Sequence, residues 1–279
     1  MSASLMNSVR RHPLVAFFAL AFAITWAIVV PLVAASRGLV DIPANSALWF
    51  MLHALGAVGP VAAAFVVTAI AEGREGVADL LARMTRWRIG TRWQLMAVFS
   101  PFLLMGLTLV LLIVFGRPAS RFGSLAAAMA TPFWLTNLLV TALAYGIGQE
   151  PGWRGFALPR LEEKYGTRGG TLVLTLLVAA WYLPLFAYQY VNLGLVGTLG
   201  FLVSLLAISL WLTHLYNSTS GSVLATTLWH VGWTVALFVG AALAPEANPV
   251  ANFLLVFIAG LLIIPISDEH VPRYYNRTT

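Results

Sequence analysis

A glutamate and an arginine four residues apart carry the clearest chemical signal in the sequence. Glu150 and Arg154 lie between an apolar run and a short basic segment, within Gly148-Gln149-Glu150-Pro151-Gly152-Trp153-Arg154-Gly155-Phe156. Residues spaced i and i+4 share one face of a helix, so the two side chains can pair. An ionised side chain at membrane depth costs on the order of 3 kcal/mol, so it needs a partner or a function. The pair is therefore either a structural ion pair or part of a site for proton transfer.

Few other polar side chains interrupt the apolar runs. His230 and Thr234 are also spaced i and i+4, whereas His53 and His214 stand alone. A lone histidine in a membrane helix commonly hydrogen-bonds a neighbouring helix. Glu150 could take a proton from water while an imidazole such as that of His230, or an amide, stabilises an oxyanion.

Other chemistries lack their residues. The chain has no Cys, no G-x-S-x-G sequence and no glycine-rich nucleotide-binding pattern. A zinc site needs at least three convergent ligands, and no two histidines lie three to five residues apart. We therefore expect no metal and no other cofactor.

The composition indicates an all-α polytopic transmembrane bundle forming a single domain, residues 1–279. Hydrophobic residues make up 60% of the chain and charged residues 9%, against about a quarter charged in soluble domains. Spanning a membrane takes about 20 apolar residues. Eight runs meet or approach this length, at residues 14–35, 47–71, 94–116, 132–148, 170–190, 196–215, 222–243 and 250–266. The first is too long for the core of a signal peptide, so we expect it to be retained.

Cations predict the orientation. All Lys and Arg residues except Arg37, Arg117 and Arg121 fall on the side of the N-terminus, which predicts cytoplasmic N- and C-termini. The excess of Arg over Lys suggests a bacterial source, and hence the inner membrane. The arginines lie in short loops, which favours a membrane-lipid surface over nucleic acid as partner. Residues 72–93 predict an interfacial amphipathic helix with an apolar stripe of Leu80, Leu81, Met84 and Trp87.

Three segments resemble the CPBP family of intramembrane proteases, which includes the type II CAAX prenyl endopeptidases and the Abi proteins. The first, from Gln149 to Leu161, resembles the family's E-E-x-x-x-R motif and its W-R-G-F/Y continuation. The second, Ala180-Trp181-Tyr182-Leu183-Pro184-Leu185-Phe186, is similar to W-H-L-P-L-F. The third comprises Leu215-Tyr216-Asn217 and His230-Val231-Gly232-Trp233-Thr234. The resemblance covers about 130–240.

The resemblance implies a glutamate-dependent endopeptidase acting on a peptide or prenylated peptide, with Glu150, Arg154 and His230 in its site. Three positions depart from the pattern: Gln149 replaces the water-activating glutamate, Tyr182 a histidine, and Thr234 an Asn or Asp. In the family, the second glutamate and the arginine organise the site, and the histidine stabilises the oxyanion. The retained residues therefore resemble a scaffold. Glu150 could replace the missing base only by breaking or sharing its pair with Arg154, and adjacent residues on a helix point about 100° apart.

Three functions stay open. The first is a membrane peptidase of weak or altered activity that cuts a membrane-adjacent peptide at its cytoplasmic end. The second is a non-catalytic relative acting as a chaperone, immunity factor or regulator. The third is an isoprenoid-acting enzyme that shelters a cation among aromatic side chains. The aromatic side chains are Trp153, Trp181, Tyr182, Phe186, Tyr188, Trp229 and Trp233. The oligomeric state is not indicated.

Overall fold

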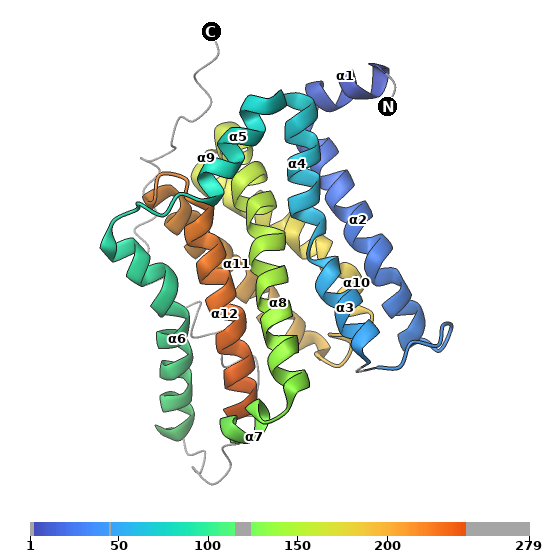
Figure 1. Ribbon diagram of the computed structural model, residues 1–279, viewed down its shortest axis with the longest axis vertical. Coiled ribbons are helices and arrows are strands. Elements are labelled where there is room, and N and C mark those ends of the chain that lie inside the picture. The colour runs from blue at the N-terminus through green and yellow to red at the C-terminus, as the bar shows by residue number, and fades with distance from the viewer. Residues whose placement is uncertain (1–2, 45, 115–123, 244–279) are drawn as a thin grey trace.

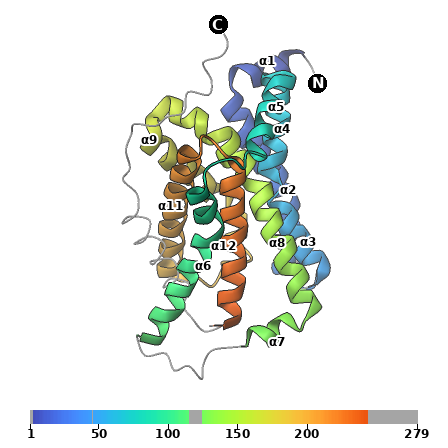
Figure 2. The same ribbon diagram turned by 60° about the vertical axis from the view of Figure 1, so that its left-hand side comes forward.

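The chain folds into a bundle of helices, and the described residues contain no strand (Figures 1 and 2). The computed structural model describes residues 3–44, 46–114 and 124–243. The helices are α1 (Ala3–Arg11), α2 (Pro13–Ser36), α3 (Ala47–Gly56), α4 (Gly59–Ala71), α5 (Gly73–Met84), α6 (Thr91–Val114), α7 (Leu125–Met129), α8 (Pro132–Glu150), the π-helical turn η2 (Pro151–Ala157), α9 (Leu158–Trp181), α10 (Leu183–Phe186), α11 (Gly194–Ser218) and α12 (Val223–Leu243). The predicted all-α membrane bundle is confirmed.

Within the described residues, five helical segments are long and apolar enough to cross a membrane. They are Pro13–Ser36, Ala47–Ala71, Thr91–Leu111, Gly194–Ser218 and Val223–Leu243. Each matches a predicted span, and the chain is an integral membrane protein. The helix α8 also forms where residues 132–148 predict it, and Asn137, Gln149 and Glu150 lower its hydropathy. The predicted span 250–266 lies outside the described residues.

The predicted span 170–190 is wrong in its second half. The helix α9 ends at Trp181, and the chain then forms the four-residue helix α10 and a series of turns. Pro184 lacks the N–H group that would continue the helix by bonding the Ala180 carbonyl oxygen, which explains the early end. Trp26 Nε1 donates to the Trp181 carbonyl oxygen at 3.2 Å and so helps to cap α9. Earlier in α9, Gly166 takes a positive φ of 70° and bends the helix.

The predicted amphipathic helix of residues 72–93 is present as α5, which is shorter than expected. Leu80 is 1% exposed and packs into the core, with Met84 partly buried against it. Leu81 is instead 46% exposed, and Trp87 lies beyond the end of α5. The predicted apolar stripe is therefore divided between the core and the surface.

Small residues let the helices near the first motif approach closely. Pro60 has no N–H with which to close the i+4 bond to the Gly56 carbonyl, and Thr25 Oγ1 donates to that oxygen at 2.8 Å. Gly59 lies directly against Thr25 of α2. On the other side of α4, Gly148 lies against the Ala57 carbonyl. The start of α4 is thus fixed between α2 and α8 by backbone contact.

A buried carboxyl group joins α9 to α11. Glu162 is 2% exposed, and Asn217 Nδ2 donates to it at 2.8 Å. Burial raises the pKa of the Glu162 carboxyl to about 7, and the hydrogen bond from Asn217 opposes this rise. Asn217 Oδ1 is buried without a hydrogen-bond partner, so a protonated carboxyl could donate to it. Glu162 lies in the first part of α9, before its apolar run.

Glu162→Gln is expected to remove a pH dependence of stability. A carboxyl whose pKa is higher in the folded than in the unfolded state loses stability as the pH rises, here from about 4.5 to about 7. At pH 8 the variant should therefore gain on the order of 1–3 kcal/mol over the wild type, and at pH 4.5 the two should be equal. Thermal unfolding in detergent at both pH values measures this. The exposed neighbour gives the control Glu163→Gln, which should show no such difference.

Candidate active site

Glu150 lies at the end of α8 and accepts two hydrogen bonds on one oxygen. Its Oε1 is 3.2 Å from Arg154 Nη1 and 2.7 Å from His230 Nδ1 of α12, while Oε2 is buried without a partner. Glu150 is 0% exposed and Arg154 4%. The structure thus brings together the three residues predicted to form a site. Their catalytic roles stay a prediction.

Arg154 is held from the opposite side by α11. Its Nη2 donates to Ser209 Oγ at 3.2 Å, and Ser209 is itself buried. Removing two charges from water costs several kcal/mol per ion unless pairing and hydrogen bonds offset it. Arg154 Nε remains buried without a partner. The pair is therefore incompletely satisfied, as in sites that act on a further group.

The turn η2 carries Arg154, and its geometry depends on two prolines. Pro151 begins the turn directly after Glu150. Pro159 has no N–H with which to close the i+4 bond to the Gly155 carbonyl. Arg83 Nη1 of α5 donates to this oxygen at 2.7 Å. Single-turn π-helices inside longer helices are frequent at functional sites.

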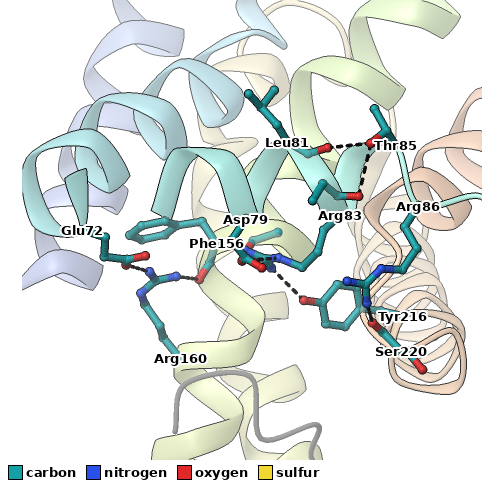
Figure 3. A network of polar contacts seen from close by, with 12 residues as sticks. Glu72, Asp79, Leu81, Arg83, Thr85, Arg86, Phe156, Arg160, Tyr216 and Ser220 are labelled. Carbon is teal, nitrogen blue, oxygen red and sulfur yellow. Dashed lines mark hydrogen bonds and ion pairs between the residues drawn. The ribbon is translucent and has the colours of Figure 1, made fainter. Parts of the chain in front are cut away.

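Figure 3 shows the polar contacts that hold α5 against η2 and the start of α9. Arg83 also bonds Asp79 at 2.8 Å and the Tyr216 hydroxyl at 3.0 Å. From the start of α9, Arg160 pairs with Glu72, donates to the Phe156 carbonyl at 2.6 Å and lies over the Phe156 ring at 3.7 Å. Two guanidinium groups therefore donate hydrogen bonds to backbone carbonyl oxygens of η2, the turn that carries Arg154.

A cavity of about 740 Å³ lies beside this cluster. Gln149, Arg154 and His230 line it, and Glu150 is not among its lining residues. Neighbouring residues on a helix point about 100° apart, which explains why Gln149 faces the cavity while Glu150 lies behind it. Glu150 can therefore act on a molecule in the cavity only through His230 or Arg154.

The three positions that depart from the resembled motifs all line the same cavity. Gln149 Oε1 accepts from Trp153 Nε1 at 3.3 Å, and its Nε2 is buried without a partner. Tyr182 and Thr234 complete the set, with the Thr234 hydroxyl bonded to the His230 carbonyl at 3.1 Å. The residues at which the chain departs from the family are thus grouped in space.

A second polar group in the cavity was not predicted. His53 Nε2 is 2.9 Å from the Tyr145 hydroxyl, and His53 Nδ1 is 2.8 Å from the Tyr188 hydroxyl. The prediction that His53 bonds a neighbouring helix holds, since Tyr145 belongs to α8. Tyr145 precedes Gln149 by four residues, so helical spacing could have placed it on the cavity face. His214 instead contacts Trp93 and Trp211 and does not line the cavity.

The aromatic residues predicted to line an interior divide into two groups. Trp153, Tyr182, Tyr188 and Trp233 line the cavity. Trp181, Phe186 and Trp229 do not line it. Trp181 and Trp229 are fully buried, and Trp229 stacks on Trp233 at 5.6 Å. Much of the aromatic content therefore serves packing.

The hydrogen bond to Glu150 sets the chemistry of His230. A carboxylate can only accept, so Nδ1 must carry the hydrogen and Nε2 of a neutral ring is left as an acceptor. His230 lines the cavity, with a side chain 14% exposed, whereas Glu150 is 0% exposed. Nε2 is therefore the ring nitrogen available to a molecule in the cavity. A carboxylate that orients an imidazole in this way is a recurrent arrangement for general-base catalysis.

Comparison with known proteins bears on the same part of the chain. Residues 131–236 match the model of the family described as type II CAAX prenyl endopeptidase Rce1-like. The chain is 22% identical over 194 residues to CAAX prenyl protease 2 of Methanococcus maripaludis. This alignment covers 66% of the present chain and 70% of the relative. The matched region contains Glu150, Arg154 and His230. Together with the helical membrane fold, these matches support the resemblance of the chain to CAAX-type membrane proteases of the CPBP family.

Proposed function

We propose that the chain is a membrane endopeptidase in which His230, oriented by Glu150, activates water. The observation that carries the proposal is the 2.7 Å hydrogen bond between His230 Nδ1 and Glu150 Oε1 beside a cavity that His230 lines. This assignment exchanges the roles expected from the sequence, where Glu150 was the base and His230 the oxyanion donor. The exchange follows from the burial of Glu150 behind the cavity wall.

The chemistry follows from these positions. His230 Nε2 takes a proton from a water molecule, and the hydroxide attacks the carbonyl carbon of the peptide bond. Gln149 lines the cavity and its Nε2 has no hydrogen-bond partner, so a turn of this side chain would bring a donor to the oxyanion of the tetrahedral intermediate. His230 then returns its proton to the leaving amine. The Glu150 carboxylate stabilises the transient imidazolium, and Arg154 holds the carboxylate in place.

A peptide-library assay tests this proposal. The purified chain in a lipid bilayer is expected to cleave at least one membrane-adjacent or prenylated peptide, and His230→Ala is expected to lower that cleavage by about 10²–10⁴-fold. The double variant Gln149→Glu, Tyr182→His restores both family residues at the cavity wall and serves as the comparison. Cleavage by the double variant but not by the unmodified chain would overturn the proposal, because the machinery would then require the missing glutamate.

A non-catalytic role is the second candidate, favoured by the place of Gln149. Its amide occupies the cavity wall where the family has its water-activating glutamate, and an amide cannot accept that proton. A chain of this kind would bind peptides without cutting them. Binding of library peptides, with no cleavage by the unmodified chain or by the double variant, would support it.

A further inference from the structure

The cavity beside Glu150 is closed at its inner end. Three lining residues there are almost fully buried: Gln149 is 2% exposed, Trp153 0% and Arg154 4%. They belong to the end of α8 and to η2, which lead toward α5 and the first part of α9 (Figure 1). A molecule in the cavity therefore does not reach solvent past these side chains.

The helix α5 covers this inner end. A Cβ atom at Gly155 would lie 2.8 Å from Leu80 Cδ1 and 3.2 Å from Val223 Cγ2, so η2, α5 and α12 meet without a gap. Arg83 is 5% exposed and joins the three elements α5, η2 and α11 through Gly155 and Tyr216. Figure 3 shows Arg83 beside Asp79 and Tyr216. The inner end of the cavity is thus closed by packing of η2 against α5 and α12 and by the hydrogen bonds of Arg83.

The other end of the cavity reaches the surface. Its lining there includes Ala44 between α2 and α3, and Gln189 after α10, and both are exposed. Asn137 lies early in α8, and Phe238 late in α12. In Figure 1 these parts of α3, α8 and α12 lie at the opposite end of the bundle from α1 and α5. The cavity therefore opens away from α5.

The positions of the arginine residues indicate which end of the bundle is cytoplasmic. Of the described residues, Arg10, Arg74, Arg88 and Arg168 lie at the end of α1, α5 and the first part of α9, whereas Arg37 follows α2 at the other end. Lys and Arg are concentrated in the cytoplasmic loops of membrane proteins. The sealed end is then cytoplasmic and the open end faces outward.

We propose that the cavity is entered from the extracytoplasmic side, and that its occupant is a peptide segment exposed on that side of the membrane. The identity of the occupant rests on the proposed peptidase function, whereas the side of entry does not. The proposal reverses the expectation of a peptide cut at its cytoplasmic end. Apolar and aromatic walls with a few polar groups suit an extended peptide with bulky side chains.

The absence of cysteine in the chain makes the side of entry directly measurable. Single variants Ala44→Cys at the mouth, Thr141→Cys in the cavity wall and Arg88→Cys at the sealed end are exposed to a charged, membrane-impermeant maleimide in intact bacterial cells. Thr141 is 8% exposed and lines the cavity, so its thiol is reached through the cavity. The first two variants are expected to be labelled in intact cells, and Arg88→Cys only after lysis.

Gly106→Cys is the matched control for the cavity variant. Nothing lies within 4 Å of a Cβ at Gly106 on the outer surface of the apolar helix α6. Its thiol should face lipid and stay unlabelled before and after lysis. Labelling of Thr141→Cys only after lysis, or in neither condition, would overturn the proposal.

A second experiment measures cleavage by oriented vesicles, and it distinguishes failure of the entry proposal from failure of the proposed peptidase function. Right-side-out vesicles are expected to cut an externally added library peptide at least tenfold faster than inside-out vesicles. Faster cutting by inside-out vesicles would contradict entry from the extracytoplasmic side even if the peptidase is active. If neither preparation cuts any peptide while the labelling pattern is as expected, the side of entry stands and the peptidase function fails.

Discussion

Glu150→Gln is expected to lower peptide cleavage by about 10²–10⁴-fold while the protein stays folded. The carboxylate holds the hydrogen of His230 on Nδ1 through a 2.7 Å bond. An amide in its place can donate to Nδ1 and leave the hydrogen on Nε2, which then cannot take a proton from water. The amide also fails to stabilise the imidazolium formed during the reaction. The measurement is kcat for a peptide identified in the library assay.

The choice of glutamine over alanine matters because of Arg154. Both substitutions leave the charge of Arg154 without its counter-charge, which costs about 3–5 kcal/mol in a buried pair. The amide oxygen of glutamine can still accept a hydrogen bond from Arg154 and the side chain fills the same space, whereas alanine does neither. Thermal unfolding of Glu150→Gln reports whether the fold persists. The exposed residue Glu75, in the first turn of α5, gives the control Glu75→Gln, which should cleave at the wild-type rate.

A double variant distinguishes a shared function from two separate ones. If Glu150 acts through His230, combining Glu150→Gln with His230→Ala should lower cleavage no further than His230→Ala alone. Additive losses would show that the carboxylate acts on the substrate independently. Cleavage by Glu150→Gln at the wild-type rate would remove Glu150 from the mechanism altogether.

The pairing of Glu150 with Arg154 could be predicted from sequence, because i,i+4 spacing is a local property of a helix. The contact with His230 could not be derived in that way. It joins residues 80 positions apart and depends on how α8 and α12 pack. Only the resemblance of three separate motifs to one family brought them together before the structure did. The apolar runs likewise predicted five of the membrane helices at nearly their observed bounds.

The roles within the site could not be predicted, because they depend on which side chains face the cavity. Sequence places Gln149 and Glu150 side by side, and the structure puts the first at the wall and the second behind it. The hydrogen bond from Arg83 to the Gly155 carbonyl oxygen could not be predicted either. It links residues far apart in sequence and arises from a carbonyl that Pro159 cannot satisfy. The end of α9 at Trp181 could not be predicted from the apolar run alone, because membrane helices often tolerate a proline.

Gly152→Ala is expected to destabilise the protein by about 1–3 kcal/mol, lowering its unfolding temperature by about 3–10 °C. A Cβ at Gly152 would lie 2.6 Å from the Pro60 carbonyl oxygen and 2.6 Å from Pro60 Cβ. Both atoms belong to the rigid first turn of α4, so η2 must move away from α4. Because η2 carries Arg154, the same shift should lower cleavage as well.

Gly106→Ala is the matched comparison in α6. Open space surrounds a Cβ there, and alanine favours a helix over glycine by up to about 1 kcal/mol. The two glycine-to-alanine changes are therefore expected to move the unfolding temperature in opposite directions in detergent micelles. An unfolding temperature of Gly152→Ala equal to or above that of the wild type would show that α4 and η2 are not in backbone contact. The Glu150–Arg154 pair would then lose the support that this packing is argued to give.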